Sequence, residues 1–337
     1  MKCKSLLFTS LIFSLITLSE CQMPVKEMPK DKQTVIKDTT VEKEVWQAPD
    51  TSSIPFDEFG AMVRYGRDLV VNTAYYIGPE GKISKNLKNK MNCSHCHLDA
   101  GTRPYAFNYL SSHARYPQYR SRENKILTLA DRVNNCIERP HSGKPLKLDS
   151  KEMVAIVCYM KWLGQNVPVN QHVEGDSPIK LKFPDRAADP IKGEEVYKRE
   201  CVVCHGKDGE GKMRLDNVCY EYPPLWGMMS YQPGSSLHRV MKAATFIYVN
   251  MPNKNSTYKN PKLSIEEAFD VAAFVNDDRI HKRPFNNGSI NYPNYKTKPL
   301  DYGTGPFVDS FPEMQHRFGP WGPIVKFREA NKLPTKF

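Results

Sequence analysis

Two short motifs in this chain place cysteine and histidine at a spacing that suits one kind of chemistry. They are Cys93-Ser-His-Cys96-His97 and Cys201-Val-Val-Cys204-His205. In C-x-x-C-H, each thiol can add to a vinyl group of a haem, and the adjacent imidazole then reaches the iron. The pattern therefore predicts two covalently attached haem c groups, with His97 and His205 as iron ligands.

A structural zinc site is the main alternative for paired cysteines. It would need four ligands in closed geometry, most simply two C-x-x-C pairs close together. Here the pairs lie more than 100 residues apart, and a histidine follows each pair directly. A redox-active C-x-x-C pair would not explain the repeated histidine, so we favour haem attachment.

Each iron needs a second axial ligand, and the identity of that ligand sets the reduction potential. Met251 lies 46 residues after His205 and precedes Pro252, a spacing typical of the distal methionine of small cytochromes. Methionines also pack as ordinary hydrophobic side chains, so other methionines compete for this assignment. The competitors are Met213, Met228, Met229 and Met241.

The first half of the chain has Cys136, and no methionine, at the corresponding place, 39 residues after His97. A thiolate is a strong anionic donor that would bind ferric iron and lower its potential. Arg132 and Arg139, one helical turn to either side, would help to keep the thiol ionised. A disulfide and a small buried thiol remain as alternatives at this stage. The candidate disulfide partners are Cys158 and Cys219.

The same two helical patterns surround each haem motif. A short helical pattern that contains Gly66 or Gly193 precedes the motif, and a longer amphipathic helix follows it. An initial helix packed against a terminal helix beside the haem is the core of a small cytochrome c domain. We therefore expect an all-α fold with two cytochrome c-like haem domains in tandem, long irregular loops and an irregular C-terminal extension.

The late helix of each half can be located from its apolar spacing and its caps. The first covers 153–163, with Ser150 to cap its start and Gly164 to end it. The second covers 265–275 and opens with the capping box Ser264-x-x-Glu267.

These signals divide the chain into six parts. The predicted parts are a signal or lipoprotein segment at 1–21, a disordered tether at 22–55, an N-terminal haem domain at 56–165, a linker at 166–188, a C-terminal haem domain at 189–280 and a wrapping extension at 281–337.

The start of the chain predicts export. Lys2 and Lys4 precede an apolar stretch at 6–18 that is too short for a comfortable membrane span. Leu18-Ser-Glu-Cys21 is typical of a lipoprotein box, in which Cys21 would be lipidated, although Glu20 replaces the usual small residue. An ordinary cleaved signal is the alternative. Both interpretations predict a protein that is exported to the periplasm. In the lipoprotein interpretation, which we favour, the lipid at Cys21 is its one contact with the membrane.

Lys and Arg together exceed Asp and Glu by 11 in the full chain. The sequence has no dense basic run interleaved with aromatic residues and no nucleic-acid-binding motif. The charge therefore favours a small anion or an acidic redox partner over nucleic acid.

Longer stretches resemble the thiosulfate dehydrogenase family of dihaem cytochromes c, from about Gly66 to Ile324. They are YIGP at 76–79, CSHCHLDAG at 93–101, ARYPQYRSRE at 114–123, RVNNCIER at 132–139, PPLWG at 223–227, NMP at 250–252 and QHRFGPWGPI at 315–324. In that family the first haem has histidine and cysteinate ligands at the substrate site. The second has histidine and methionine ligands and passes electrons outward. The resemblance implies that Cys136 is an iron ligand.

The resemblance also implies a reaction, in which two thiosulfates are coupled to tetrathionate, or the reverse, with an external electron carrier such as a small cytochrome. Two dianions must be brought together, so fixed positive charge is required. Arg122 and Arg132 match positions expected to line the site, and an exposed helix face is the other reading of these arginines. A dihaem electron carrier without substrate chemistry of its own is the alternative function.

One departure from the family follows Cys136. The family usually continues Ser-x-Asn-Gly after C-x-E-R, whereas this chain has Pro140-His141-Ser142-Gly143. The change leaves the direction of the reaction open, and also the exact substrate, which could be a related sulfur oxyanion or an organic thiol. His141 could be a proton or anion contact, but we favour its interpretation as an exposed loop residue.

Overall fold

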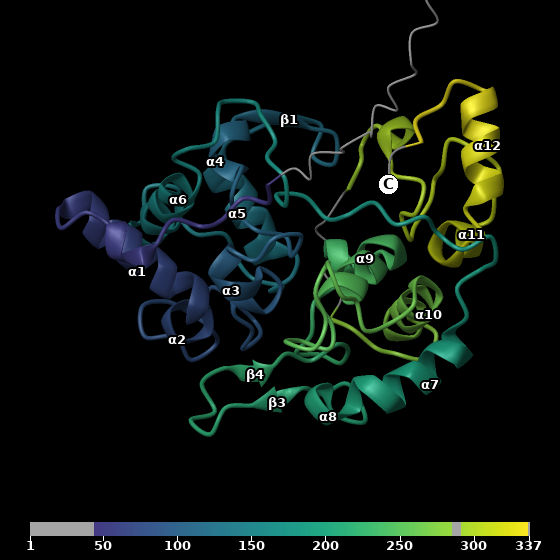
Figure 1. The fold of residues 1–337 in the computed structure, drawn as a ribbon, viewed down its shortest axis with the longest axis horizontal. Coiled ribbons are helices and arrows are strands. Elements are labelled where there is room, and N and C mark those ends of the chain that lie inside the picture. The colour runs from purple at the N-terminus through teal and green to yellow at the C-terminus, as the bar shows by residue number, and fades with distance from the viewer. Residues whose placement is uncertain (1–43, 285–290, 336–337) are drawn as a thin grey trace, which may run out of the picture. The chain divides into compact units, whose positions relative to one another are not determined.

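A computed structural model of the chain describes residues 44–284 and 291–335 (Figure 1). Most of the regular elements in the described residues are helices, and the strands form two short antiparallel pairs, β1–β2 and β3–β4. The expected signal segment 1–21, its Cys21, and residues 22–43 of the expected tether lie outside the described residues.

A first group of elements, here called the first lobe, surrounds the first haem motif. Its elements are η1 (Thr51–Ser53), α1 (Glu58–Val71), α2 (Thr73–Ile77), η2 (Cys93–His95), α3 (Leu98–Gly101), α4 (Ser112–Arg115), β1 (Gln118–Arg120), β2 (Lys125–Leu127), α5 (Leu129–Glu138) and α6 (Lys151–Leu163).

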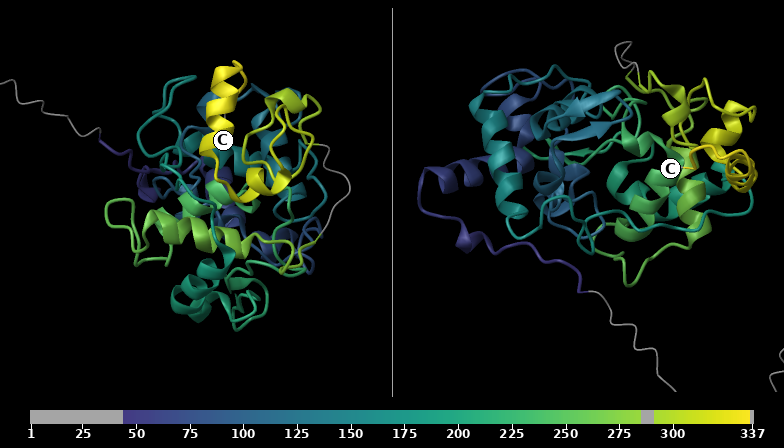
Figure 2. Two further views of the ribbon diagram at one scale, coloured as in Figure 1. Left: turned by 90° about the vertical axis from the view of Figure 1, so that its right-hand side faces the viewer. Right: turned by 90° about the horizontal axis from the view of Figure 1, so that it is seen from above.

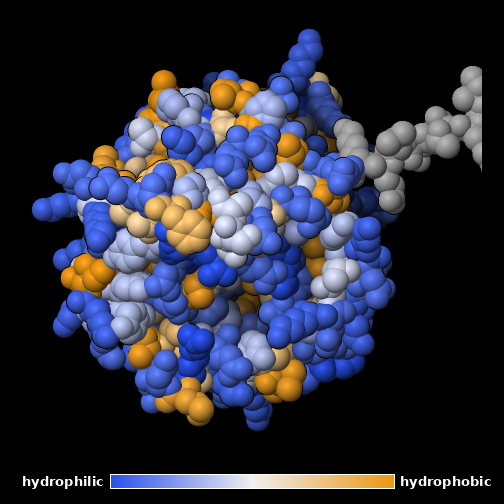
Figure 3. Space-filling view, turned by 60° about the vertical axis from the view of Figure 1, so that its left-hand side comes forward, coloured by the Kyte–Doolittle hydropathy of each residue, from blue (hydrophilic) through white to orange (hydrophobic). Residues whose placement is uncertain are grey.

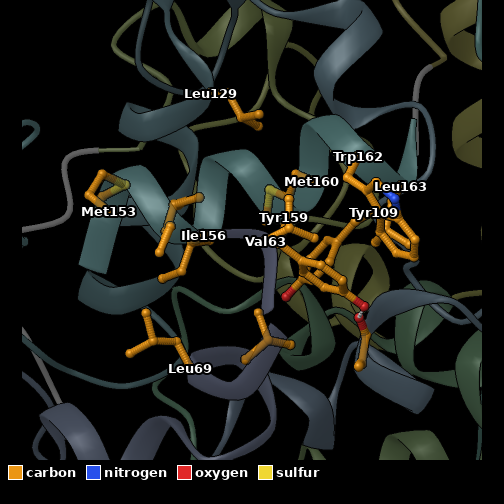
Figure 4. Close-up of a cluster of buried hydrophobic side chains, with 14 of the residues drawn as sticks. Val63, Leu69, Tyr109, Leu129, Met153, Ile156, Tyr159, Met160, Trp162 and Leu163 are labelled. Carbon is orange, nitrogen blue, oxygen red and sulfur yellow. Dashed lines mark hydrogen bonds between the residues drawn. The ribbon is translucent and has the colours of Figure 1, made fainter. Parts of the chain in front are cut away.

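Helices α1 and α6 pack against each other at Gly66, which leaves no room for a side chain. A Cβ built there would lie 2.0 Å from the Ala155 carbonyl oxygen and 2.9 Å from the Tyr159 Cβ. Around this contact, Val63 and Met153 belong to one buried apolar cluster (Figure 4). The first lobe is therefore built on a close crossing of its initial and terminal helices.

A second group, here called the second lobe, surrounds the second haem motif. Its elements are α7 (Pro190–Glu200), α8 (Val202–His205), β3 (Lys212–Met213), β4 (Tyr220–Tyr222), η3 (Ser236–His238), α9 (Val240–Asn250) and α10 (Ile265–Val275). Between α6 and α7, which bound the expected linker 166–188, the chain forms no helix or strand.

The second lobe repeats the packing of the first. A Cβ at Gly193 of α7 would lie 2.0 Å from the Asp270 carbonyl oxygen and 2.9 Å from the Phe274 Cβ. The initial and terminal helices of this lobe, α7 and α10, therefore cross as α1 and α6 do (Figure 1). The expected pair of cytochrome c-like helical cores is confirmed.

The two late helices lie where their caps predict them. Ser150 Oγ accepts from the Met153 backbone N–H at the start of α6, and Gly164 caps its end. At α10, Ser264 and Glu267 exchange the two hydrogen bonds of the capping box, at 3.1 and 2.9 Å.

The described end of the expected tether is attached to the first lobe. Ile54 is 4% exposed, and Trp46 packs against the same apolar cluster. The Trp46 backbone N–H also donates to the Glu174 carbonyl oxygen at 3.1 Å. Residues 44–55 therefore differ from the expected tether, because their apolar side chains have a partner to pack on.

The C-terminal extension is more regular than expected. It contains η4 (Tyr295–Thr297), α11 (Glu313–Phe318) and α12 (Gly322–Ala330). Both helices lie beside the second lobe (Figure 2), and Phe318, Trp321 and Ile324 are buried in a cluster with Phe269 of α10. The expectation of a wholly irregular extension is corrected, because these apolar residues complete the core of the second lobe.

The face drawn in Figure 3 is mostly hydrophilic, with scattered apolar side chains. Within the described residues, every helix is too short or too polar to serve as a membrane span.

Candidate functional site

Each C-x-x-C-H motif folds as one helical turn that ends at its histidine. The backbone N–H of His97 donates to the Cys93 carbonyl oxygen at 2.9 Å, and His205 does the same to Cys201 at 2.9 Å. The two cysteines of each motif and the histidine are thereby fixed relative to one another.

Both histidines are oriented by a backbone carbonyl. Nδ1 of His205 bonds to the Pro223 carbonyl oxygen at 2.8 Å, and Nδ1 of His97 bonds to the Phe107 carbonyl oxygen. A carbonyl accepts only from N–H, so the proton lies on Nδ1 and Nε2 remains as the atom that can bind iron. This orientation is the one that a haem-ligating histidine requires.

A cavity of about 790 Å³ reaches both haem motifs, since Cys96 of the first motif is part of its wall. Cys201, Cys204 and His205 line it together with Met251, which follows the last residue of α9. Much of the remaining wall is apolar. Examples are Leu225, Phe246, Leu263 and Val271. Two thiols, an oriented imidazole, a thioether and an apolar wall are the groups that would hold a covalent haem with histidine and methionine ligands.

The competing methionines are placed elsewhere. Met228 and Met229 are 68% and 47% exposed, Met241 is buried in the core cluster, and Met213 lies on β3. Since none of the four lines the cavity, the structure favours Met251 among the candidates.

At the first motif, the counterpart of Met251 is Cys136 on α5. Arg132 Nη1 donates to Cys136 Sγ at 3.0 Å, and the imidazole of His97 lies within hydrogen-bonding reach of the same sulfur. Burial raises the pKa of this thiol, but the positive charges of Arg132 and Arg139 outweigh that effect and lower the pKa to about 6.

This shift separates Cys136 from the cysteines of the haem motifs. Burial raises the pKa of Cys93 to about 11, and the pKa values of Cys96 and Cys201 to about 12. Cys136 is thus the thiol whose surroundings stabilise an anionic sulfur, as an iron-binding cysteinate or a nucleophile requires.

Neither of the candidate disulfide partners is bonded to Cys136. Cys136, Cys158 and Cys219 are free thiols in the part of the chain that the structure describes. Cys219 is buried, and its sulfur accepts from Arg214 Nη1 at 3.5 Å. The disulfide reading of Cys136 is therefore not supported.

Two further arginines share the surroundings of Cys136. Arg139 pairs with Glu123 at 3.0 Å, and their side chains are only 11% and 14% exposed. Burial and then the positive charges of Arg122 and Arg132 lower the pKa of Arg139 to about 10, so the three guanidinium groups act on one another. Glu123 offsets one of the three charges, and the site keeps a net positive charge.

Arg122 is held by residues that the sequence analysis did not single out. Its Nε donates to Asn291 Oδ1 at 2.7 Å, and its Nη2 donates to the Gly234 carbonyl oxygen at 2.5 Å and to the Tyr302 hydroxyl at 3.3 Å. Arg139 was assigned only as a neighbour of the thiol. Its position three residues after Cys136 was the signal that it belongs to the site, whereas no local signal marks Gly234, Asn291 or Tyr302.

The expectation that His141 is exposed is wrong. The side chain is 4% exposed, and its Nδ1 bonds to Asn89 Oδ1 at 2.9 Å. Burial lowers its pKa to about 3. Asn89 also donates to the Pro140 carbonyl oxygen at 3.0 Å, so the altered segment is tied to the chain just before the first motif.

Two family models match the chain. SoxA/TsdA, cytochrome c domain, matches residues 84–169, and Cytochrome c matches residues 191–277. Cytochrome c domains carry covalently bound haem c, which agrees with one C-x-x-C-H motif in each matched range.

Curated relatives match between 65% and 72% of the chain. Thiosulfate dehydrogenase of Thiomonas intermedia is 34% identical over 72% of this chain and 73% of its own. That of Psychrobacter arcticus is 36% identical over 70% of this chain and 69% of its own. That of Allochromatium vinosum is 35% identical over 65% of this chain and 79% of its own.

A solved structure agrees with these matches. Thiosulfate dehydrogenase (TsdBA) from Marichromatium purpuratum superposes with a TM-score of 0.64 at 29% identity, over 69% of this chain. The match spans about half of that longer chain, 49%. Together with the two haem motifs and the repeated helical core, these matches show that the chain belongs to the thiosulfate dehydrogenase family of c-type cytochromes.

Proposed function

We propose that this chain is an oxidoreductase that couples two thiosulfate ions to tetrathionate, or catalyses the reverse reaction, beside Cys136. The observation that carries the proposal is the Cys136 sulfur itself. It lies between the histidine of the first haem motif and Arg132, in a group of three arginines with one carboxylate.

The proposal assigns two covalent haem c groups. Cys93 and Cys96 would attach the first, with His97 and Cys136 as ligands. Cys201 and Cys204 would attach the second, with His205 and Met251 as ligands. When bound, the haem groups supply one-electron redox steps, so that two electrons can leave separately. The domains would follow the boundaries 56–165 and 189–280, with 166–188 as linker and 281–337 as extension.

The main barrier to this reaction is the repulsion between the negative charges of the two substrate ions, and the arginines would lower it. Two S2O3 dianions give one S4O6 dianion and two electrons when a sulfur–sulfur bond forms, so four negative charges must first be brought together. At about 4 Å, two dianions repel by roughly 4 kcal/mol even in water, and by more in a partly buried site. The charges of Arg122, Arg132 and Arg139, only one of them paired with Glu123, would offset this repulsion.

The electrons require an external acceptor, for which a small cytochrome is the expected partner. We further propose that the protein is exported to the periplasm, and that a lipid on Cys21 holds it at the membrane through residues 22–43. The matches to curated thiosulfate dehydrogenases support the activity, and the amino-terminal sequence pattern supports the anchor.

Steady-state turnover of the haem-loaded protein tests the function. Thiosulfate with ferricyanide measures the forward direction, and tetrathionate with a reduced dye measures the reverse. Cys136→Ala should remove at least about 99% of kcat in both directions while both haems stay attached, because the variant lacks the sulfur at the reaction centre. Cys158→Ala, which removes a free thiol elsewhere in the first lobe, is the matched control and should retain activity.

Wild-type protein with reversible haem reduction but no turnover in either direction would contradict the proposal. That result would favour an electron carrier, or a substrate other than thiosulfate. Pro140→Ser would then show whether the altered segment after Cys136 is responsible, through recovery of thiosulfate turnover.

A further inference from the structure

We propose that the C-terminal extension completes the substrate site, with Asn291 and Tyr302 as positioning residues that aim Arg122 at the anion. The inference rests on the proposed function, in which Arg122 binds a sulfur oxyanion. It adds a requirement that the first lobe alone cannot meet.

The hydrogen bonds of Arg122 divide its donors into two sets. A guanidinium has five N–H donors. The Nε donor and the two Nη2 donors are taken up by Asn291, Gly234 and Tyr302. Within the described residues, Nη1 donates to no acceptor, so its two N–H groups remain for a ligand.

The acceptors of Arg122 orient it without neutralising it. An amide oxygen, a backbone carbonyl and a phenol are all uncharged, and the Tyr302 ring also lies 5.8 Å from the guanidinium carbon. Arg139, in contrast, is paired with Glu123 at 3.0 Å. Among residues 44–284 and 291–335, Arg122 forms no ion pair, so its full charge remains available to an anion.

The extension is itself anchored, which a positioning role requires. The Tyr292 backbone N–H donates to the Arg122 carbonyl oxygen at 2.8 Å, and the Tyr292 and Tyr302 rings contact edge to face at 5.1 Å. Just before Tyr302, Asp301 pairs with Arg239 at the start of α9, and Leu300 is fully buried in the core cluster of the second lobe. Asn291 and Tyr302 are therefore held against Arg122 from the second lobe.

Two arrangements of Arg122 follow from these contacts. With the extension in place, the side chain is confined to one orientation before substrate arrives. Without the Asn291 and Tyr302 acceptors, the guanidinium would be held by Gly234 alone and would have to be ordered on binding. Losing this pre-organisation weakens anion binding and has less effect on the bond-forming step.

The test uses the full haem-loaded protein and two readouts. Tyr302→Phe removes the hydroxyl acceptor and keeps the ring, and Asn291→Ala removes the amide. Each should raise the KM for thiosulfate about five- to tenfold, with kcat changed less than about twofold. Calorimetric binding of tetrathionate to the fully oxidised protein, which has no electrons to reduce it, should weaken by the same factor. Tyr295→Phe, an exposed tyrosine of the same extension, is the control and should change neither value.

A double-mutant cycle separates positioning from a general structural role. If Tyr302 acts through Arg122, Tyr302→Phe should have no further effect on KM or on tetrathionate binding in the Arg122→Ala background. An effect of equal size in both backgrounds would overturn the inference. Unchanged KM and binding in Tyr302→Phe and Asn291→Ala, with an active wild type, would also overturn it and leave the proposed function intact. A wild type that neither binds tetrathionate nor turns over would refute both.

Discussion

Replacing Gly66 by alanine should destabilise the first lobe, because this glycine is the point where α1 and α6 touch. The new Cβ would lie 2.0 Å from the Ala155 carbonyl oxygen, whereas distances under 3.0 Å essentially never occur. The obstacle is helix backbone, which cannot rotate away as a side chain can, so the helices must separate by about 1 Å.

The size of the effect follows from two opposing terms. Overpacking a well-packed core costs about 1–3 kcal/mol, and a backbone obstacle places Gly66→Ala at the upper end. Alanine gains about 1 kcal/mol over glycine in helix propensity. The net loss is about 2 kcal/mol, which corresponds to a fall in Tm of roughly 8–16 °C for a lobe of this size.

Thermal unfolding of the haem-loaded protein, followed by far-ultraviolet circular dichroism, measures this fall once haem content is shown to equal that of the wild type. Gly193→Ala should lower the Tm of the second lobe in the same way, since its Cβ would lie 2.0 Å from the Asp270 carbonyl oxygen. Gly322→Ala is the control, because a Cβ there meets nothing within 4 Å. A Tm for Gly66→Ala within about 4 °C of the wild type, less than 1 kcal/mol, would refute the reasoning.

Three further outcomes can be measured by chemical denaturation. Arg186→Ala should lower the free energy of unfolding by about 2–3 kcal/mol, because it removes two hydrogen bonds, 2.8 and 2.7 Å long, to the buried carboxylate of Asp270. The loss is smaller than for a fully buried ion pair, since the Arg186 side chain is one-third exposed. A loss below about 0.5 kcal/mol would contradict this expectation. His281 stacks on Trp226, and burial lowers its pKa from 6.5 to about 4, so the unfolded chain takes up a proton first. The free energy of unfolding should therefore fall as pH drops from 6.5 to about 4 and be unaffected above that window, and His281→Gln should lessen the fall; an unchanged pH profile would count against it. Ser142→Gly should stabilise the protein by about 1 kcal/mol, because Ser142 has a left-handed φ of 50° and a buried hydroxyl without a hydrogen bond, and a destabilised variant would oppose this account.

The helices that build each lobe could be predicted because their signals are local. The caps of α6 and α10 lie within one turn of the helix ends, and their apolar spacing repeats within a dozen residues. The helices of the extension, α11 and α12, were missed for the opposite reason. Their apolar residues, such as Trp321, become informative only when Phe269 of the second lobe is known to pack against them.

In the candidate site too, contacts between residues close in sequence could be predicted, and contacts between distant residues could not. Arg132 and Cys136 are four residues apart on one helix, so their contact follows from the helical repeat. His141 was misjudged because the partner that buries it, Asn89, lies 52 residues away. The acceptors of Arg122 are 112, 169 and 180 residues further along the chain, and no periodicity relates them to it.

Local and distant residues have separate roles in the candidate site. Local residues supply the sulfur and the positive charges beside it, but distant residues decide where those charges point. Gln232 donates to the Glu138 carbonyl oxygen at 2.6 Å and Gly234 holds Arg122, so the second lobe contacts both ends of the arginine group. A first lobe folded alone would keep Arg132 beside Cys136 and lose all three of the acceptors described for Arg122. Electrostatic stabilisation depends on charges that are already oriented before the substrate binds, so the anion site belongs to the two lobes and the extension together.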